Sequence, residues 1–349
     1  MTTAASRGMI RIDPADLVAT AGAATTLGEL DAALTEQNVW VALDPPGPLS
    51  QSLGSVLEHG AGGPLSALFG PPRDQVIGLS FVAGNGTRIK SGGRVVKNVA
   101  GFDLAKAVIG GWGAFGAIAE ANLRLRARPE SDETRAWSGP RDAVVAAAAG
   151  LQAEGSMLAC CEVLSPELAS SLELPARWHL IVRALGTRAG VREELDAAAS
   201  ATVGLQGADT EPRIWTRWRG TVGGWPVAAR IGADPAAWPA AAALAVSLGA
   251  EAVGVCIPRG TVRARFAAGT AKALIALRAE SRSRGWPVTI ERADDATLRL
   301  VGIWGEMNAG ALALSKALRR TLEPGGTQDV PLWAGEQTEN RVTGQAATG

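Results

Sequence analysis

The stretch that decides the fold of this chain runs from Ser91 to Leu125 and reads SGGRVVKNVAGFDLAKAVIGGWGAFGAIAEANLRL. Seven of its residues are glycines: Gly92, Gly93, Gly101, Gly110, Gly111, Gly113 and Gly116. Glycine costs backbone entropy on folding, so such a cluster implies either tight turns with positive φ or a close approach of the backbone to a ligand.

The pattern around these glycines predicts a turn, a helix, a glycine loop and a strand, in that order. Asp103 is a typical N-cap, and Gly110 and Gly111 end the short helix behind it. After Gly116 the hydrophobic period becomes two, which indicates a half-buried strand. A glycine loop of this kind can point several N–H groups at a phosphate or a flavin edge. The glycines either form such a site or only pack turns.

Two common nucleotide-binding motifs are excluded for this stretch. A dinucleotide fingerprint runs from a strand through glycines into a helix, whereas this glycine loop leads into a strand. A P-loop is excluded because no Gly-Lys-Ser/Thr follows the glycines.

The strings GGRVVKNVAGFDL and GGWGAFGAIAEANLRL, read together, resemble the end of the PCMH-type FAD-binding domain of the vanillyl-alcohol oxidase superfamily. Within that superfamily the stretch is most similar to the FAD-binding subunits of bacterial glycolate oxidases. The resemblance covers residues 6–128, weakens over the second half of the chain, and returns at residues 315–326. It implies FAD as a non-covalently bound cofactor.

The resemblance also implies which residues line the cofactor. Gly54 falls in a second FAD-contact region, where the family usually has two adjacent glycines and this chain has Ser55. Arg94 and Lys97 are candidates to offset phosphate charge, although Lys97 could equally be a solvated surface lysine. The expected FAD-binding set is Gly54, Ser55, Gly62, Gly63, Arg94, Lys97, Gly110, Gly111, Gly113, Gly116, Ala117 and Ile118. No catalytic residue and no metal site is predicted.

The family's domain normally begins with a further segment that carries the loop around the FAD pyrophosphate. The resemblance starts at about Ser6, so that loop is expected to be missing from this chain. A pyrophosphate needs several N–H donors or cations, and FAD is therefore expected to bind more weakly.

Composition excludes several classes of protein. The 349 residues include 47% hydrophobic and 19% charged residues, which excludes a disordered chain and allows two domains. Lys+Arg and Asp+Glu number 34 each, so nothing favours nucleic acid as a partner. The cysteines are Cys160, Cys161 and Cys256, an odd number that fits a reducing, cytoplasmic compartment. No apolar run is long enough for a transmembrane helix.

The predicted fold class is α+β, with a truncated PCMH-type FAD-binding domain at 1–128, an α+β cap domain at 129–330 and a loose tail at 331–349. In the first domain, residues 26–29 (TLGE) form a capping box, residues 52–74 form a loop, and Asn85-Gly86 forms a type I′ hairpin turn. Pro129–Pro140 is expected to be a linker. We expect cap-domain helices at 141–154, 191–201, 238–248, 262–284 and 309–322, and strands at 157–164, 178–185, 226–231, 252–257, 287–291 and 297–304. The helices are expected on one face of the sheet.

Two functions follow from the resemblance. The first is the FAD-binding subunit of a glycolate or other 2-hydroxy-acid oxidase, with a larger flavoprotein subunit and an iron–sulfur subunit as partners. Arg183, Arg230 and Arg259 are its candidate cations for a substrate carboxylate. The second is a non-catalytic assembly subunit that has lost or weakened flavin binding, which the missing loop and Ser55 favour. His59 is interpreted as a structural or solvent-facing residue, and His179 as a core or sheet residue.

Overall fold

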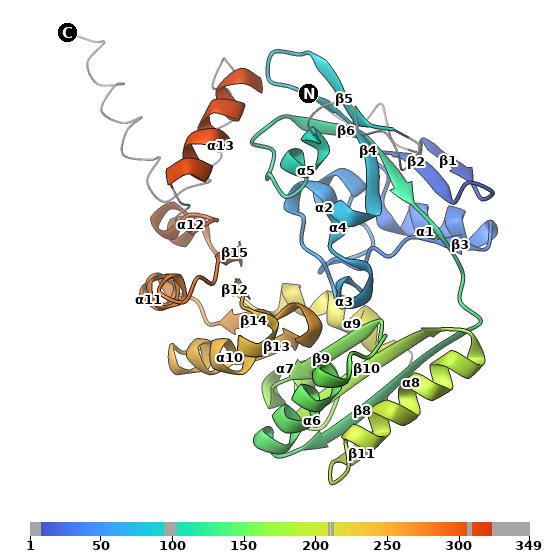
Figure 1. The fold of residues 1–349 in the computed structure, drawn as a ribbon. Helices are drawn as coiled ribbons and strands as arrows, with labels where there is room; N and C mark the ends of the chain where they lie inside the picture. The colour runs from blue at the N-terminus through green and yellow to red at the C-terminus, as the bar shows by residue number, and fades with distance from the viewer. Residues whose placement is uncertain (1–7, 94–102, 209, 211–212, 306–308, 323–349) are drawn as a thin grey trace. The chain divides into compact units, whose positions relative to one another are not determined.

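The computed structural model describes residues 8–93, 103–208, 210, 213–305 and 309–322. The chain divides into two compact units (Figure 1). Unit 1 comprises Met1–Arg128 and Met307–Val330, and unit 2 comprises Pro129–Glu306 and Pro331–Gly349. The predicted domains placed residues 129–330 together, whereas here the helix α13 (Ala309–Leu322) is grouped with unit 1. The carbonyl of Leu322 accepts the N–H of Gly84, 2.8 Å away.

Unit 1 is built on a five-stranded antiparallel sheet with the order β1-β2-β6-β4-β5. Its strands are β1 (Ile10–Asp13), β2 (Val18–Gly22), β4 (Val76–Val82), β5 (Arg88–Gly92) and β6 (Ala117–Arg124). A separate pair is formed by β3 (Val39–Trp40) and β7 (Arg126–Ala127). The helices besides α13 are α1 (Leu27–Glu36), α2 (Leu53–His59), α3 (Ser66–Phe69), α4 (Pro72–Gln75) and α5 (Leu104–Val108).

The predicted caps of two helices in unit 1 are confirmed. The side chain of Thr26 accepts the N–H of Glu29, and the Glu29 carboxylate accepts the N–H of Thr26 at 2.8 Å. This capping box stabilises α1, whose buried leucines face the core, by roughly 1 kcal/mol. Asp103 caps α5 by accepting the N–H of Lys106.

The region between residues 52 and 74 is not the loop that the sequence predicted. It contains the three short helices α2, α3 and α4. Each is too short to show a hydrophobic period, and α2 and α4 are recognisable mainly by Ser52 as N-cap and by Pro72 in the first turn. The hairpin between β4 and β5 is confirmed, but its turn is not type I′. Of Asn85 and Gly86 only Gly86 has positive φ (84°), and the Asn85 side chain instead accepts the N–H of Thr87.

Unit 2 is an eight-stranded antiparallel sheet with the order β11-β8-β10-β9-β13-β14-β12-β15. Its strands are β8 (Ser131–Gly139), β9 (Cys160–Leu164), β10 (Trp178–Gly186), β11 (Gln206–Ala208), β12 (Val227–Gly232), β13 (Ala252–Cys256), β14 (Thr261–Phe266) and β15 (Val288–Arg292). Its α-helices are α6 (Arg141–Glu154), α7 (Pro166–Ser171), α8 (Arg188–Ala201), α9 (Ile214–Gly220), α10 (Trp238–Ser247), α11 (Ala271–Arg282) and α12 (Asp295–Val301). Short 3₁₀ turns are η2 (Thr221–Gly224), η3 (Pro235–Ala237) and η4 (Ile257–Arg259).

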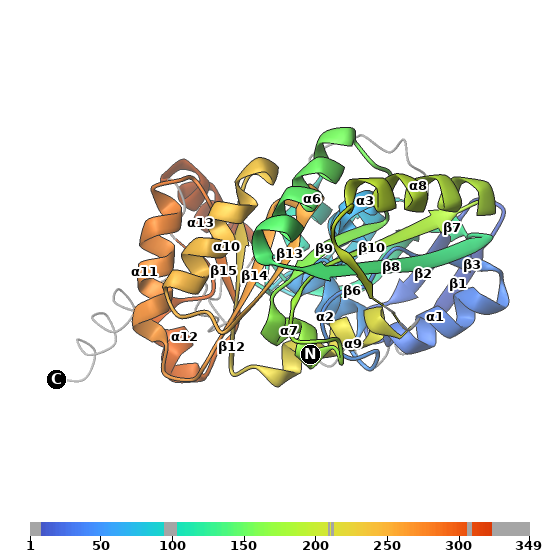
Figure 2. The same cartoon turned by 90° about the horizontal axis from the view of Figure 1, so that it is seen from below.

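Helices cover both faces of this sheet rather than the single face that we expected (Figure 2). One face packs its core against α6, α8, α10 and α11, with Trp238 as a large, fully buried side chain. The opposite face packs a smaller cluster against α7 and α9. Both cores follow from the strand period of two: in β10, Leu180 and Val182 face the first core and Ile181 faces the second.

Three predicted elements of unit 2 are wrong. The expected linker at 129–140 is the nine-residue strand β8, whose polar residues pair with β10. The expected helix at 262–284 begins as the strand β14 and is helical only from Ala271. The expected strand at 297–304 is the helix α12, which Asp294 caps by accepting the N–H of Thr297 at 2.8 Å.

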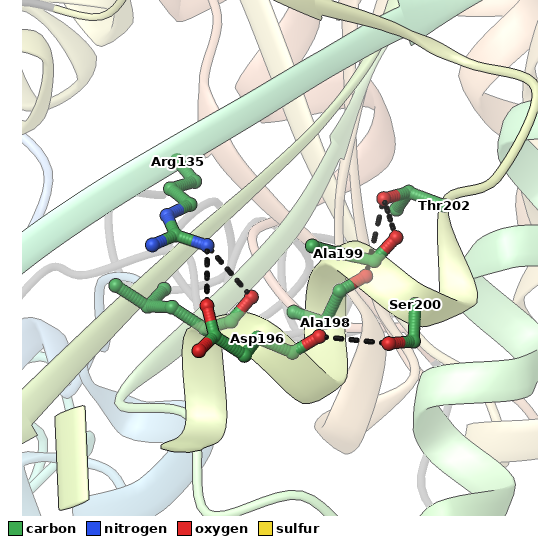
Figure 3. Close-up of polar contacts among 7 residues, drawn as sticks. Arg135, Asp196, Ala198, Ala199, Ser200 and Thr202 are labelled. Atoms are coloured by element: carbon green, nitrogen blue, oxygen red, sulfur yellow. Dashed lines mark hydrogen bonds and ion pairs between the residues drawn. The ribbon is translucent and has the colours of Figure 1, made fainter. Parts of the chain in front are cut away.

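The side chain of Arg135 links the polar strand β8 to the helix α8 (Figure 3). Arg135 donates to the carbonyl of Leu195 at 3.1 Å and to the carboxylate of Asp196 at 3.3 Å. At the end of the same helix, the hydroxyl of Thr202 donates to the carbonyls of Ala198 and Ala199. The Thr202 contacts give a side-chain donor to carbonyl groups of the last helical turn, which a helix end otherwise leaves without intrahelical partners.

Candidate functional site

The fold brings together two glycine-rich segments of unit 1 that lie about fifty residues apart in sequence. The N–H of Gly110 donates to the carbonyl of Leu57, and the N–H of Trp112 donates to the carbonyl of Glu58, both at 2.9 Å. A Cβ on Gly60 would lie 2.7 Å from the Cα of Gly110, so the two backbones touch where only glycine fits. We call residues 52–63 and 110–118 the paired glycine segments. They contain ten of the twelve residues that the sequence assigned to FAD.

Gly54 and Ser55 occupy the first turn of α2. The N–H groups of Leu53 and Gly54 donate to the carbonyls of Thr25 and Ala23, and the N–H of Ser55 donates to the hydroxyl of Ser52. A Cβ on Gly54 would lie 2.9 Å from the Cβ of Ala23. Gly54 is therefore required for the packing of α2 against the end of β2.

Gly62 and Gly63 lie in the loop that follows α2. A Cβ on Gly63 would lie within 2 Å of the carbonyl oxygen of Asp44, which no side chain could tolerate. The Asp44 carboxylate also accepts the N–H of Leu65 at 2.8 Å. Asp44 and Gly63 together fix the path of this loop.

The sequence left two alternatives open for the loop from Gly110 to Gly116. Its N–H groups could point at a common ligand, or its glycines could only pack turns. In the structure Gly110, Gly111, Trp112 and Gly116 all donate their N–H groups to backbone carbonyls of the chain. Gly116 has φ 129°, and a Cβ there would lie 2.5 Å from the carbonyl oxygen of Val82. These glycines therefore build the turn into β6, and those four N–H groups are already engaged.

Ala117 and Ile118 begin β6, and the N–H of Ile118 donates to the carboxylate of Glu58, with 3.3 Å between nitrogen and Oε1. Partial burial raises the pKa of Glu58, although this hydrogen bond and the charge of His59 act in the opposite direction. Sequence reasoning did not single out Glu58. The available signal was its place directly before His59-Gly60, within the glycine-rich segment.

Arg94, Lys97 and the two histidines were also singled out in the sequence. Arg94 and Lys97 lie outside the described residues. His59 is exposed, its Nδ1 lies 2.7 Å from the carbonyl oxygen of Ser55, and its ring packs edge-on against Trp112. His179 is fully buried in β10, as predicted, and burial lowers its pKa.

Unit 2 holds buried cations that the sequence reasoning did not find. Arg183 and Arg230, two of the expected carboxylate ligands, form ion pairs with Asp132 and Glu291. Arg265 in β14 is only 3% exposed, and its Nε and Nη1 have no hydrogen-bond partner among the described residues. Burial lowers the pKa of Arg265 to about 10, against the opposing effect of Glu291. Sequence reasoning missed Arg265 because it predicted a helix at 262–284, whereas this residue lies in the strand β14.

The charges of Glu291 and the arginines around it in the unit 2 sheet act on one another. Burial acts to raise the pKa of Glu291, but the charges of Arg230, Arg263 and Arg265 outweigh it and hold that pKa below its usual value. The guanidinium of Arg263 also lies 5.1 Å from the ring centroid of Trp218. Arg263 and Arg265 face away from the core of α6 and α10, because they alternate with Val262, Ala264 and Phe266.

Among the described residues there is neither a metal site nor a membrane-spanning helix. Within the described ranges, no three His, Cys, Asp or Glu side chains are grouped so as to hold a metal ion. No described helix combines the length and the apolar character that crossing a bilayer requires.

Residues 2–92 match the family described as the FAD binding domain. This segment of the chain is therefore similar to an FAD-binding domain. FAD is accordingly its cofactor, as the resemblance predicted. The match covers the first of the paired glycine segments, residues 52–63, and ends before the second.

Curated relatives of this chain include proteins named glycolate oxidase subunits and D-lactate dehydrogenases. The chain is 33% identical over 126 residues to the glycolate oxidase subunit GlcE of Escherichia coli (strain K12), with 36% of each chain covered. It is 31% identical over 126 residues to the glycolate oxidase subunit GlcD of Bacillus subtilis (strain 168), covering 36% of this chain and 27% of the relative. A mitochondrial D-lactate dehydrogenase [cytochrome] of Arabidopsis thaliana is 30% identical over 188 residues, 52% of this chain and 33% of the relative. The matched segments thus span about a third of each relative.

Among solved structures, alkyldihydroxyacetonephosphate synthase matches with a TM-score of 0.67 over 91% of this chain and 65% of its own. At 15% sequence identity this likeness concerns the fold alone. It agrees with the predicted α+β fold class over most of the chain.

The described residues offer few free N–H groups to the pyrophosphate of FAD. The N–H groups of Gly110, Gly111 and Trp112 already have acceptors. The Cβ positions of Gly60 and Gly63 meet other atoms of the chain, so packing accounts for these two glycines. The cation candidates for the pyrophosphate, Arg94 and Lys97, lie outside the described residues.

Proposed function

We propose that this chain is an FAD-dependent oxidoreductase subunit that acts on a 2-hydroxy acid such as glycolate. The FAD-binding-domain match and the relatives named as glycolate oxidase subunits and D-lactate dehydrogenase support this proposal. When bound, FAD supplies the hydride acceptor, and the protein contributes binding, orientation and electrostatics.

The observation that carries the proposal is the contact between Gly60 and Gly110. It joins the first glycine-rich segment, within the family match, to the second, beyond it. Gly54, Ser55, Gly62 and Gly63 in the first segment would hold the cofactor. From the second, the contacts would come from Gly110, Gly111, Gly113, Gly116, Ala117 and Ile118.

The test is an absorbance spectrum of the purified chain, followed by titration with FAD. We expect a flavin spectrum or saturable uptake of FAD by protein that circular dichroism shows to be folded. Absence of any uptake by the folded chain would contradict the proposal.

We further propose that Arg265 binds the carboxylate of the substrate. A buried guanidinium whose Nε and Nη1 have no hydrogen-bond partner among the described residues is suited to a carboxylate, which can accept two parallel hydrogen bonds. In the assembled oxidase, Arg265→Lys should raise KM for glycolate at least tenfold and change kcat less, because a lysine cannot form the bidentate contact. An unchanged KM would exclude this role.

The partners that we propose are a larger flavoprotein subunit and an iron–sulfur subunit, in the cytoplasm. The names of the GlcE and GlcD relatives, both called subunits, support an assembly. Affinity purification of the tagged chain from its own cells should recover both partners in constant ratio. Recovery of the chain alone would contradict the assembly.

A second candidate function is a non-catalytic assembly subunit. The observation that favours it is that Gly110, Gly111, Trp112 and Gly116 donate their N–H groups within the chain. This function predicts that the chain recovers its partners and supports their activity while taking up no FAD itself. Substitutions at Gly60 would then leave the activity of the complex unchanged.

A further inference from the structure

The carboxylate of Glu58 accepts a hydrogen bond from a backbone N–H group, that of Ile118, at the end of the unit 1 sheet. The strand β2 pairs with β6 as far as Gly22, and the N–H of Ala23 makes the last contact, to the carbonyl of Ala119. One residue earlier in β6, the N–H of Ile118 donates to Glu58 Oε1. Glu58 thus supplies the acceptor at the point where the neighbouring strand has ended.

This carboxylate lies between the paired glycine segments. The carbonyl of Glu58 accepts the N–H of Trp112, and the next residue, His59, packs its ring against the Trp112 ring with 4.3 Å between centroids. Glu58 therefore belongs to the first segment and contacts the second through both its backbone and its side chain.

The contact to Ile118 is weak enough to be exchanged. A hydrogen bond from an N–H to a full carboxylate is usually shorter than about 3 Å, whereas this one measures 3.3 Å. Partial burial also disfavours the charged form of Glu58. A flavin brings neutral acceptors on its ring together with a negatively charged pyrophosphate, which a nearby carboxylate repels.

We propose that FAD displaces Glu58 from the Ile118 amide, so that Glu58 limits FAD affinity and makes it fall as pH rises. The proposal rests on the FAD binding proposed for this chain. It assigns to Glu58 a positioning role at the cofactor rather than a role in hydride transfer.

The direction of the pH effect follows from linkage. FAD removes the hydrogen bond that favours the carboxylate and adds negative charge, so the pKa of Glu58 is higher in the complex than in the free protein. Binding therefore takes up a proton between those two pKa values, and the Kd rises at most tenfold per pH unit there. Of the described charged groups, His59 on the same helix acts on Glu58, and Glu120 lies two residues from Ile118 on β6.

The experiment titrates FAD into four proteins between pH 5 and pH 8 and follows the quenching of flavin fluorescence. In the wild type we expect Kd to rise with pH. Glu58→Gln should bind FAD at least tenfold more tightly at pH 8 and show a flat profile, because the amide carries no charge that repels the pyrophosphate and does not titrate. Glu120→Gln is the matched control for loss of one negative charge on β6. His59→Gln removes the neighbouring imidazole, whose charge acts on Glu58, and both controls should keep the wild-type slope.

The outcomes separate this inference from the proposed function. Equal Kd values and equal slopes in the wild type and Glu58→Gln overturn the role of Glu58 but leave FAD binding intact. A slope that disappears only in His59→Gln assigns the effect to His59 and overturns it as well. If no variant binds FAD, the proposed function fails together with this inference. Should Glu58→Gln not fold, calorimetry of His59→Gln in two buffers of different ionisation enthalpy must still detect proton uptake on FAD binding.

Discussion

Substitution of Gly60 by alanine tests whether the contact between the paired glycine segments is what the site requires. Gly60 has φ 64°, and this left-handed conformation costs a residue with a Cβ about 1–2 kcal/mol. The new methyl group would also lie 2.7 Å from the Cα and 3.1 Å from the nitrogen of Gly110, and relieving such overpacking costs typically about 1–3 kcal/mol. The expected loss of unfolding free energy is therefore about 2–5 kcal/mol.

The matched control is Gly86→Ala. Gly86 also has positive φ, at 84°, and lies in unit 1, but its Cβ would meet nothing within 4 Å. Only the conformational cost of about 1–2 kcal/mol applies to it. The difference between the two variants isolates the contact with Gly110.

The assay is urea denaturation followed by circular dichroism, with FAD titration of each folded variant. Gly60→Ala should lose more stability than Gly86→Ala and should bind FAD at least tenfold more weakly, because the segments must separate. Equal stability losses, or unchanged FAD affinity in Gly60→Ala, would refute the reasoning.

Three further predictions concern stability and reactivity. Glu291→Gln removes the carboxylate that faces three guanidinium groups and should destabilise unit 2 by about 3–5 kcal/mol in urea unfolding. Folding lowers the pKa of Glu291, so the carboxylate stabilises the fold at pH values above its ordinary pKa of 4.5. That stabilisation should disappear as the pH falls below 4.5. Thr26→Ala breaks the capping box and should cost about 1 kcal/mol, whereas an unchanged unfolding midpoint would show that α1 does not depend on its cap. Cys160, Cys161 and Cys256 are buried, and burial raises the pKa of the Cys161 and Cys256 thiols, so none should react with iodoacetamide before unfolding, as mass spectrometry would show.

Elements with strong local signals could be predicted from the sequence. The helix α6 has the predicted bounds, Arg141–Glu154, and α1 begins behind its predicted cap at Thr26. Both are specified by residues close together in the chain: α1 by its cap and spaced leucines, and α6, which has no side-chain cap, by its helical spacing of apolar residues before Gly155. The same holds for β6, whose alternation after Gly116 predicted a strand.

Elements that depend on distant partners could not be predicted. The polar segment 131–139 resembles a linker by composition, but it is a strand because β10 pairs with it and Arg183 binds Asp132. The segment 261–266 joins β12 and β13 to form the centre of a sheet, and this pairing buries Arg263 and Arg265. Ionic partners from other strands decide whether such a charged segment can be buried, and local propensity does not register them.

The features of the candidate site also divide into those that the sequence predicts and those that depend on distant partners. From the sequence by itself, the resemblance to the PCMH-type FAD-binding domain predicted an FAD-binding domain, whereas the glycine spacing alone left ligand binding and turn packing both open. Only the tertiary structure decided what each glycine touches: Gly60 meets Gly110, Gly63 meets Asp44, and the N–H groups of the second segment are engaged within the chain. It also placed Glu58 against Ile118 across sixty residues of sequence. A spacing pattern specifies backbone conformation locally, whereas the partner of each donor and of each Cβ position depends on segments that meet only after folding.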